Sequence, residues 1–255
     1  MTIQYCSDLH LEFSRNRKFI TENPLLPQAD ILVLAGDVVP FKMMHKHMDF
    51  FLYLSDHFKH VYWIPGNHEH YGGDIRERSG SFEESVFRNV HLLNNKTVTF
   101  NNVKLIFSTL WSNISPGRKW VIERGLSDFL SITNHDQPFT SNEYNQLHHE
   151  SLVFLKKELM EHPVKPCVVV THHVPTLRYY PDEYKNSPIN EAFATELFPL
   201  IDKNGPDVWI YGHHHRNTAD FKIGNTVLAT NQLGYVQYNE HLQFDPSRYL
   251  SVGSS

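Results

Sequence analysis

The 255-residue chain is poor in cysteine and contains no long apolar run. Its two cysteines, Cys6 and Cys167, both lie inside short apolar segments, which predicts buried thiols in a reducing cytoplasm rather than a disulfide framework. No apolar run approaches the roughly 18 residues that a membrane-spanning helix needs. The stretch Met1–Asp8 is too short and too polar for the apolar part of a secretory signal. We therefore expect a cytoplasmic protein that is not associated with a membrane.

The chain also lacks a basic tract, and its formal net charge is −5. This charge argues against a nucleic-acid-binding module whose affinity depends on overall positive charge. Hydrophobic residues make up 40% and charged residues 20%, as in ordinary globular proteins, so a disordered chain is excluded. No internal repeat is present and no protein partner is evident. The chain length allows one large domain or two small ones, and we predict a single domain over residues 1–255.

Short apolar runs alternate with helical patterns along the chain. The runs expected to form strands are Ile3–Cys6, Ile31–Ala35, Val61–Ile64, Val103–Phe107, Cys167–Thr171 and Val208–Tyr211, with a hairpin of Phe221–Ile223 and Thr226–Ala229. Helices are expected over Lys42–Phe58, about Asp74–Phe87, Ser141–Glu161 and Asn190–Asp202. This alternation favours a layered α/β fold. Residues 112–140, where Asn, Ser, Pro and Gly interrupt the pattern, are expected to form a cap-like excursion over the active face.

The chain is rich in histidine, with 18 residues of this type. Five strand-like runs end in side chains that can bind a metal ion. These side chains are Asp8 and His10; Asp37; Asn67, His68 and Glu69; His172 and His173; and His213, His214 and His215. Ligands of an open α/β sheet bind beyond the carboxyl ends of its strands. We therefore expect the five segments to converge on one small volume.

The types of these side chains predict the chemistry. Carboxylate, imidazole and one amide oxygen, without a thiolate, suit Mn, Fe, Co, Ni or Zn ions. The set is too large for one tetrahedral site but sufficient for two ions if one carboxylate bridges them. Two ions about 3.5–4 Å apart hold both the attacking and the leaving oxygen of a phosphoryl displacement. Two divalent cations with Asp8 and Asp37 keep a net positive charge, which suits an anionic phosphoryl group.

Five motifs, in this order, resemble those of the calcineurin-like metallophosphoesterases. They are Asp-x-His at 8–10, Gly-Asp at 36–37, Gly-Asn-His-Glu at 66–69, Thr-His-x-x-Pro at 171–175 and Gly-His-x-His at 212–215. The resemblance implies a four-layer α/β/β/α sandwich, in which two packed mixed β-sheets are flanked by helices, with a binuclear metal centre. It further implies that Asp8, His10 and His215 bind one ion, that Asn67, His172 and His213 bind the other, and that Asp37 bridges them.

One assignment within these motifs follows from spacing. Thr171, His172 and Pro175 fit the fourth motif, and the alternation of side chains along a strand lets only one of His172 and His173 face the metals. We therefore predict His172 as the ligand. The resemblance also implies that a metal-bound hydroxide attacks the phosphorus in line, while His68 assists at the phosphoryl oxygens and the leaving group. Glu69 is expected to orient a histidine ligand.

The chain departs from the protein-phosphatase branch of this family, in which the second motif continues with an Asp and a phosphate-binding Arg. Here Val38-Val39-Pro40-Phe41-Lys42 follows instead. The departure favours a phosphodiesterase, acting on cyclic nucleotides or nucleic-acid ends. The alternatives are a phosphomonoesterase or nucleotide pyrophosphatase acting on a small metabolite, and a non-catalytic metal-binding scaffold. Candidate substrate contacts are Arg178 and Tyr71, and Trp111 and Trp120 are expected to anchor the core.

Overall fold

The computed structural model describes residues 1–161 and 163–253, which form two six-stranded sheets and a small two-stranded one. The first sheet has the order β14 (Tyr249–Ser251), β1 (Thr2–Cys6), β2 (Ile31–Ala35), β3 (His60–Ile64), β5 (Val90–Asn94) and β4 (Phe82–Phe87). The second has the order β12 (Phe221–Ile223), β13 (Thr226–Thr230), β11 (Val208–Tyr211), β10 (Cys167–Thr171), β7 (Val103–Ser108) and β6 (Lys96–Phe100).

In both sheets the inner strands are parallel and the outer strands are antiparallel to their neighbours. The parallel register is continuous: Cys6 of β1 lies beside Leu34 of β2, which in turn lies beside Trp63 of β3. Consequently the chain leaves β1, β2 and β3 at nearly the same level. This arrangement brings the loops that follow these strands to one edge of the sheet.

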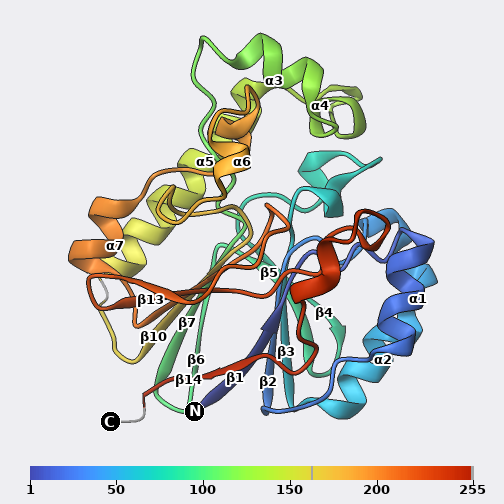
Figure 1. Cartoon of the computed structure of the whole chain (residues 1–255), viewed down its shortest axis with the longest axis vertical. Coiled ribbons are helices and arrows are strands. Elements are labelled where there is room, and N and C mark those ends of the chain that lie inside the picture. Colours follow the sequence, from blue (N-terminus) through green and yellow to red (C-terminus); the bar gives the residue numbers. More distant parts are fainter. Residues whose placement is uncertain (162, 254–255) are drawn as a thin grey trace.

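Three apolar cores hold four layers together, as expected from the sequence. Side chains such as Tyr5 and Phe107 fill the space between the two sheets. The outer face of the first sheet packs on α2 (Met48–His57), where the rings of Phe51 and Trp63 are stacked with centroids 5.0 Å apart. Helices α5 (Ser141–Lys156) and α7 (Phe198–Asn204) cover the second sheet, and α1 (Ser14–Glu22) lies beside α2 (Figure 1). The predicted four-layer α/β/β/α sandwich is thus confirmed.

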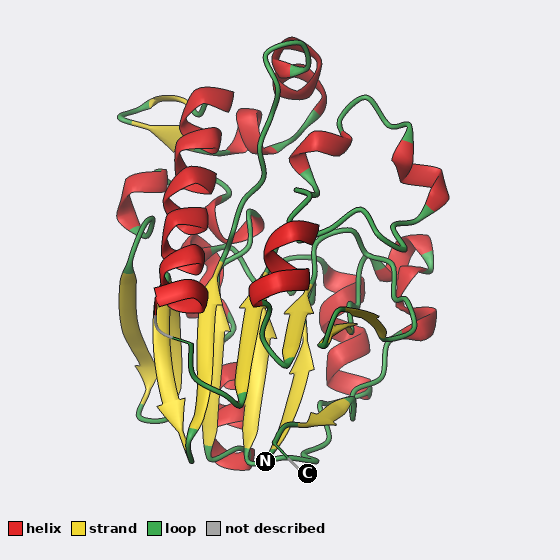
Figure 2. Cartoon of the chain, turned by 90° about the vertical axis from the view of Figure 1, so that its left-hand side faces the viewer, coloured by secondary structure: helices red, strands yellow, loops and turns green. Residues whose placement is uncertain are grey.

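The segment from residue 112 to 140 projects beyond the strand ends, at the top of Figure 1. It contains α3 (Lys119–Gly125), α4 (Asp128–Ser131) and the short strands β8 (Thr133–Asn134) and β9 (Gln137–Pro138). Its apolar side chains, such as Phe129, pack with Trp111 and Tyr144, which flank the segment, in a fourth core that also includes Ile75 and Ala192. Trp120, by contrast, is 69% exposed, so the expectation that it anchors the core was wrong. Figure 2 shows this segment above the sheets in a second view.

The remaining helices are short. They are α6 (Asp182–Lys185), a π-helical turn at Lys157–Glu161 that continues α5, and 3-10 turns at Phe41–Lys46, His68–His70, Ile75–Glu77, Asn190–Ala192, Val236–Tyr238 and Glu240–Gln243. No helix formed by residues 1–161 and 163–253 has the length and apolar character needed to cross a membrane.

The helix predicted over about Asp74–Phe87 was wrong. The chain there forms a 3-10 turn at Ile75–Glu77 and then the edge strand β4, whose first residues alternate between half-buried and exposed. Gly80 adopts a left-handed φ of 68° and separates the turn from the strand. The predicted helix Lys42–Phe58 is divided into a 3-10 turn and α2. The predicted helix Asn190–Asp202 is divided into a 3-10 turn at Asn190–Ala192 and α7, which begins at Phe198 with Pro199 in its first turn.

Candidate metal centre

The predicted ligands meet at the carboxyl ends of the parallel strands. Asp8, Asp37 and Asn67 follow β1, β2 and β3, whereas His172 and His213 follow β10 and β11 of the second sheet. All five are at most 5% exposed. The site therefore lies between the two sheets and is built by both of them.

The backbone at this site is held in a conformation that side chains rarely adopt. The residues Asp8, His10, Asp37, His213 and His215 all have left-handed φ angles between 48° and 81°. Such a conformation costs free energy and persists only where the surroundings enforce it, as at functional sites. Gly36 and Gly66 provide the necessary space, because a Cβ atom at either position would collide with His172.

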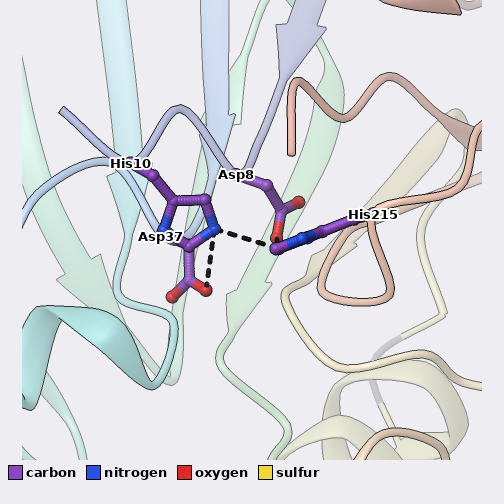
Figure 3. Close-up of side chains that lie close together, drawn as sticks. All are labelled: Asp8, His10, Asp37 and His215. Atoms are coloured by element: carbon purple, nitrogen blue, oxygen red, sulfur yellow. Dashed lines mark hydrogen bonds and ion pairs between the residues drawn. The ribbon is translucent and has the colours of Figure 1, made fainter. Parts of the chain in front are cut away.

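Asp8, His10, Asp37 and His215 form a first group, in which one potential ligand atom of each lies within 4.8 Å of the others (Figure 3). His10 Nε2 lies 2.9 Å from His215 Nε2 and 3.8 Å from a carboxylate oxygen of Asp37. His215 Nε2 is 3.3 Å from Asp8 Oδ1. The nitrogen and oxygen atoms that these three distances separate are close enough for a single cation to bind them.

Asp37, His172 and His213 form a second group with the same closeness. His172 Nε2 lies 3.4 Å from Asp37 Oδ2 and 3.1 Å from His213 Nδ1. Asn67 adds its amide oxygen, 3.2 Å from His172 Nε2. Asp37 belongs to both groups, so its carboxylate occupies the position that a bridging ligand requires.

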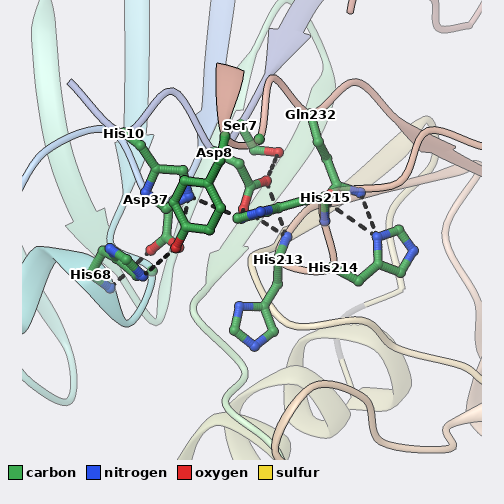
Figure 4. A network of polar contacts seen from close by, with 12 residues as sticks. Ser7, Asp8, His10, Asp37, His68, His213, His214, His215 and Gln232 are labelled. Atoms are coloured by element: carbon green, nitrogen blue, oxygen red, sulfur yellow. Dashed lines mark hydrogen bonds and ion pairs between the residues drawn. The ribbon is translucent and has the colours of Figure 1, made fainter. Parts of the chain in front are cut away.

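The neighbouring histidines point elsewhere. His173 Nε2 is 2.9 Å from the hydroxyl of Tyr144, and its Nδ1 lies 3.2 Å from the carbonyl oxygen of Thr109. His214 Nδ1 accepts a hydrogen bond of 2.9 Å from the Gln232 amide (Figure 4). Thus His172 belongs to the second group and His215 to the first. Their sequence neighbours, His173 and His214, make hydrogen bonds outside the two groups.

The charges of the site call for a cation. The ion-pair partners of the buried carboxylates Asp8 and Asp37 are histidines. Burial alone lowers the pKa of a histidine, yet Asp37 raises the pKa of His172 to about 9, and hydrogen bonds to Asp8 and Glu240 raise that of His215 to about 10. These protons supply the positive charge that a metal ion can supply instead. The donor set of carboxylate, imidazole and amide oxygen fits such an ion.

The outer nitrogen of each of three ligand rings is also bonded. His10 Nδ1 lies 3.2 Å from Glu12, His215 Nδ1 lies 2.8 Å from Glu240, and His172 Nδ1 donates to the carbonyl oxygen of Ala35 at 2.9 Å. These contacts orient the Nε2 atoms toward the group. Sequence reasoning missed both glutamates. Glu12 could have been found from its place two residues after His10, whereas nothing in the sequence marks Glu240.

Glu69 has a different role from the one expected. Its carboxylate accepts hydrogen bonds from the backbone N–H groups of Asp37 (2.9 Å), Val38 (2.7 Å) and Gly66 (2.7 Å), and from the indole of Trp63 (3.1 Å). It therefore joins the loop after β2 to the loop after β3. Glu69 positions the backbone of the site and does not orient a histidine ligand.

His68 lies at the wall of the site beside both groups. Its Nδ1 is 3.0 Å from Glu12 Oε1, its Nε2 is 3.3 Å from the Tyr235 hydroxyl, and its ring is stacked on Tyr71 with centroids 4.1 Å apart. Burial opposes protonation of His68, but the charges of Asp37 and Glu12 outweigh it and raise the pKa above the usual value. With His10 and Glu12 it forms a third close group.

A cavity of about 1010 Å³ opens over these residues. Leu130 and Ser131 of the excursion contribute to its wall, as does Tyr71. Of the described residues that line it, Lys42 is the one lysine and none is an arginine. Arg178 lies outside this lining, and its guanidinium group covers the ring of Phe198 at 4.4 Å.

Comparison with known proteins identifies the family of the chain. The family model of the calcineurin-like phosphoesterases matches residues 1–217. The chain is also 31% identical to the uncharacterised protein L509 of Acanthamoeba polyphaga mimivirus, over 98% of this chain and 96% of that protein. The crystal structure of phosphopantetheinyl hydrolase (PptH) from Mycobacterium tuberculosis covers 92% of this chain and 90% of its own, with a TM-score of 0.66 and 18% identity.

The chain therefore belongs to the calcineurin-like phosphoesterase family, which is a family of metal-dependent phosphoester hydrolases. The resemblance inferred from the five motifs is confirmed. The similarity to the mycobacterial hydrolase concerns the fold.

Proposed function

We propose that this protein is a phosphodiesterase that uses two divalent metal ions. The observation that carries the proposal is the cavity over Asp37, which is large and is lined by described residues that include no arginine. A monoester carries two negative charges and gains more from a guanidinium group than a diester, which carries one. A cavity without arginine therefore favours the diester.

Asp8, His10, Asp37 and His215 are the candidates to hold one ion, and Asp37, Asn67, His172 and His213 are the candidates to hold the other. Ions of the Mn, Fe, Co, Ni or Zn type suit these side chains. When bound, such ions would lower the pKa of a water molecule and neutralise phosphoryl charge.

His68 is the candidate general acid. Glu12 holds its Nδ1, so the proton available to the departing oxygen resides at Nε2, where Tyr235 also contacts the ring. The raised pKa keeps the ring protonated closer to neutral pH. Stacking on Tyr71 fixes the plane of the imidazole. These contacts hold a proton donor at one atom beside the metal groups.

The aromatic residues Phe13, Tyr184 and Phe193 line the cavity and suit a substrate with a planar base, such as a cyclic nucleotide or a nucleic-acid end. Lys42 favours a second candidate, a nucleotide pyrophosphatase, because its cation could bind a second phosphate group. Lys42→Ala should then weaken turnover of a nucleoside diphosphate ester. Lys46→Ala, on the same turn but outside the lining, is the matched control.

The deciding experiment is a turnover panel in the presence of Mn²⁺. It contains bis-p-nitrophenyl phosphate, p-nitrophenyl phosphate, cyclic nucleotides, a 3′-tailed oligonucleotide, a phosphopantetheinyl ester and a phosphoserine peptide. We expect the bis-aryl diester to have the higher kcat/KM of the two aryl esters, and the peptide to release negligible phosphate. A clearly higher kcat/KM for p-nitrophenyl phosphate contradicts the diesterase, and turnover of no substrate favours the non-catalytic scaffold.

A further inference from the structure

One buried carboxylate reaches the metal groups from outside the five motifs. Asp128 begins α4 in the excursion, is fully buried, and lies 61 residues from Asn67 along the chain. Its Oδ1 accepts a hydrogen bond of 2.7 Å from the Asn67 side-chain nitrogen and one of 2.6 Å from the Tyr71 hydroxyl. A carboxylate is rarely buried without a specific reason, since desolvation of its charge is costly.

The first of these bonds determines which way the Asn67 amide faces. Because Oδ1 of Asp128 accepts this hydrogen bond, the side of the amide that faces Asp128 is its NH₂ group. The amide oxygen then faces the opposite side, where it lies 3.2 Å from His172 Nε2. That is the side of the second metal group, and only the oxygen of an amide can bind a cation. The reverse orientation would direct two N–H groups at the ion.

The hydrogen bond from Tyr71 to Asp128 also affects the position of His68. Tyr71 donates its hydroxyl proton to Asp128, and its ring is stacked against the imidazole of His68 with an angle of 29° between the planes. The hydroxyl also lies 3.3 Å from the Asn67 nitrogen. One carboxylate thus holds two neighbouring side chains of the loop after β3 in a single arrangement.

We propose that Asp128 is a positioning residue that fixes the Asn67 amide with its oxygen toward the metal site, so that docking of the excursion completes this site. The inference rests on the proposed function, because it takes Asn67 as a metal ligand. It gives the segment 112–140 a role beyond covering the cavity: the segment supplies a group without which one ion is bound less tightly.

The test is a calorimetric titration of metal-stripped, full-length protein with Mn²⁺. Asp128→Ala should weaken the binding of one ion by about 10- to 100-fold, the usual effect of removing a partner of a ligand, and leave the other ion unchanged. Asp128→Asn, which keeps an oxygen that can accept from Asn67, should retain more affinity than Asp128→Ala. The control is Asp136→Asn, which removes a carboxylate from an exposed position of the same segment.

A double-mutant cycle separates positioning from general destabilisation. If Asp128 acts through Asn67, Asp128→Ala should have no further effect on Mn²⁺ affinity in an Asn67→Ala background. Equal effects in both backgrounds would overturn the proposal, as would an unchanged affinity in Asp128→Ala itself. If Asp128→Ala does not fold, the double variant Asp128→Leu/Tyr71→Phe replaces it. Leucine fills the space of the carboxylate, and Tyr71→Phe removes the hydroxyl that would otherwise lose its hydrogen-bond acceptor. The same loss of affinity is expected from this double variant, and wild-type affinity would overturn the proposal.

These outcomes differ from failure of the proposed function. Wild-type protein that binds no second ion contradicts the two-metal phosphodiesterase itself. Wild-type protein that binds two ions with an affinity independent of Asp128 contradicts the positioning role alone.

Discussion

Asp37 is the side chain on which the two-ion arrangement depends. It is buried, belongs to both close groups, and its pKa is held well below the usual value because the charges of His172 and His68 outweigh the effect of burial. Asp37→Asn removes one negative charge between two expected cations. We expect the variant to lose at least one ion and at least about 100-fold in Mn²⁺ affinity, by comparison with the effect of removing a ligand's partner.

Metal analysis after reconstitution with excess Mn²⁺ measures this loss. Asp30→Asn, which alters a surface ion pair with Lys59, is the control and should bind the wild-type number of ions. A wild-type protein that holds one ion per chain would contradict the arrangement.

His68 should affect chemistry and leave metal binding intact. A general acid contributes about 10²–10⁴-fold, and it matters most when the departing oxygen is a poor leaving group. His68→Asn should therefore reduce kcat on a nucleotide or alkyl diester by this amount, and by much less on a p-nitrophenyl ester. Glu12→Gln, which leaves the imidazole but weakens its charge partner, should show part of the same difference.

Two results would refute this role of His68. Equal losses on both kinds of ester would mean that His68 only stabilises phosphoryl charge. Loss of metal from the His68→Asn variant would make the residue a ligand, in keeping with its place in the third close group.

Among the helices and strands, most inner strands and the hairpin of β12 and β13 were predictable, whereas the edge strand β4 was not. The runs Ile31–Ala35 and Cys167–Thr171 are mostly apolar and buried at every position because helices or a second sheet cover both faces, and both were placed correctly. The edge strand β4 has charged and half-buried positions, FEESVF, that fit a helix equally well in isolation. Its pairing with β5, which the local pattern does not encode, determines the strand.

In the candidate site, too, residues marked by the local sequence were predictable and residues brought in by tertiary contacts were not. The residues of the two close groups were predictable as neighbours because each follows an apolar strand within a short motif. Glu240 and Asp128 were not, because their contacts join segments 25 and 61 residues apart along the chain. Only the folded chain brings such residues together, so their roles depend on tertiary packing.

Helix α5 carries a group that should make the fold sensitive to acid. His148 is buried, its Nδ1 donates to the carbonyl oxygen of Leu110 at 3.1 Å, and burial lowers its pKa. In the unfolded chain the ring takes up a proton below its ordinary pKa of about 6.5, whereas burial disfavours this proton in the folded chain. The stability contributed by neutral His148 is therefore complete above this pH and is lost as the pH falls below it.

We expect His148→Gln to reduce the loss of unfolding free energy between pH 7.5 and 5.5, by at most about 1 kcal/mol. Urea unfolding of metal-stripped protein measures it. His149→Gln, the exposed neighbour on the same helix, should leave the difference between the two pH values unchanged. Wild-type pH dependence in His148→Gln would show that this ring does not titrate on unfolding.

At the scale of the whole molecule, the two close groups join loops of both sheets, whose facing sides pack through apolar side chains. Asp8, His10 and Asp37 belong to loops of the first sheet, and His172 and His215 to loops of the second. Further contacts cross at the same edge, such as that of the His213 backbone N–H with Asp8 at 3.1 Å. Unfolding separates these loops, so an ion bound by both sheets is released when the chain unfolds.

A bound metal should consequently stabilise the entire fold. A ligand of the native state alone contributes about 2.7 kcal/mol at 100 times its Kd. For a chain of this size, 1 kcal/mol shifts Tm by about 2–4 °C. We therefore expect Mn²⁺ at that excess to raise the Tm of metal-stripped protein by roughly 5–10 °C, and EDTA to reverse the rise, as followed by calorimetry. Asp37→Asn should show a smaller rise, because it loses the carboxylate common to both groups. An equal rise in this variant would place the stabilising ion elsewhere, and a Tm independent of Mn²⁺ and EDTA would mean that the two sheets are not joined by metal.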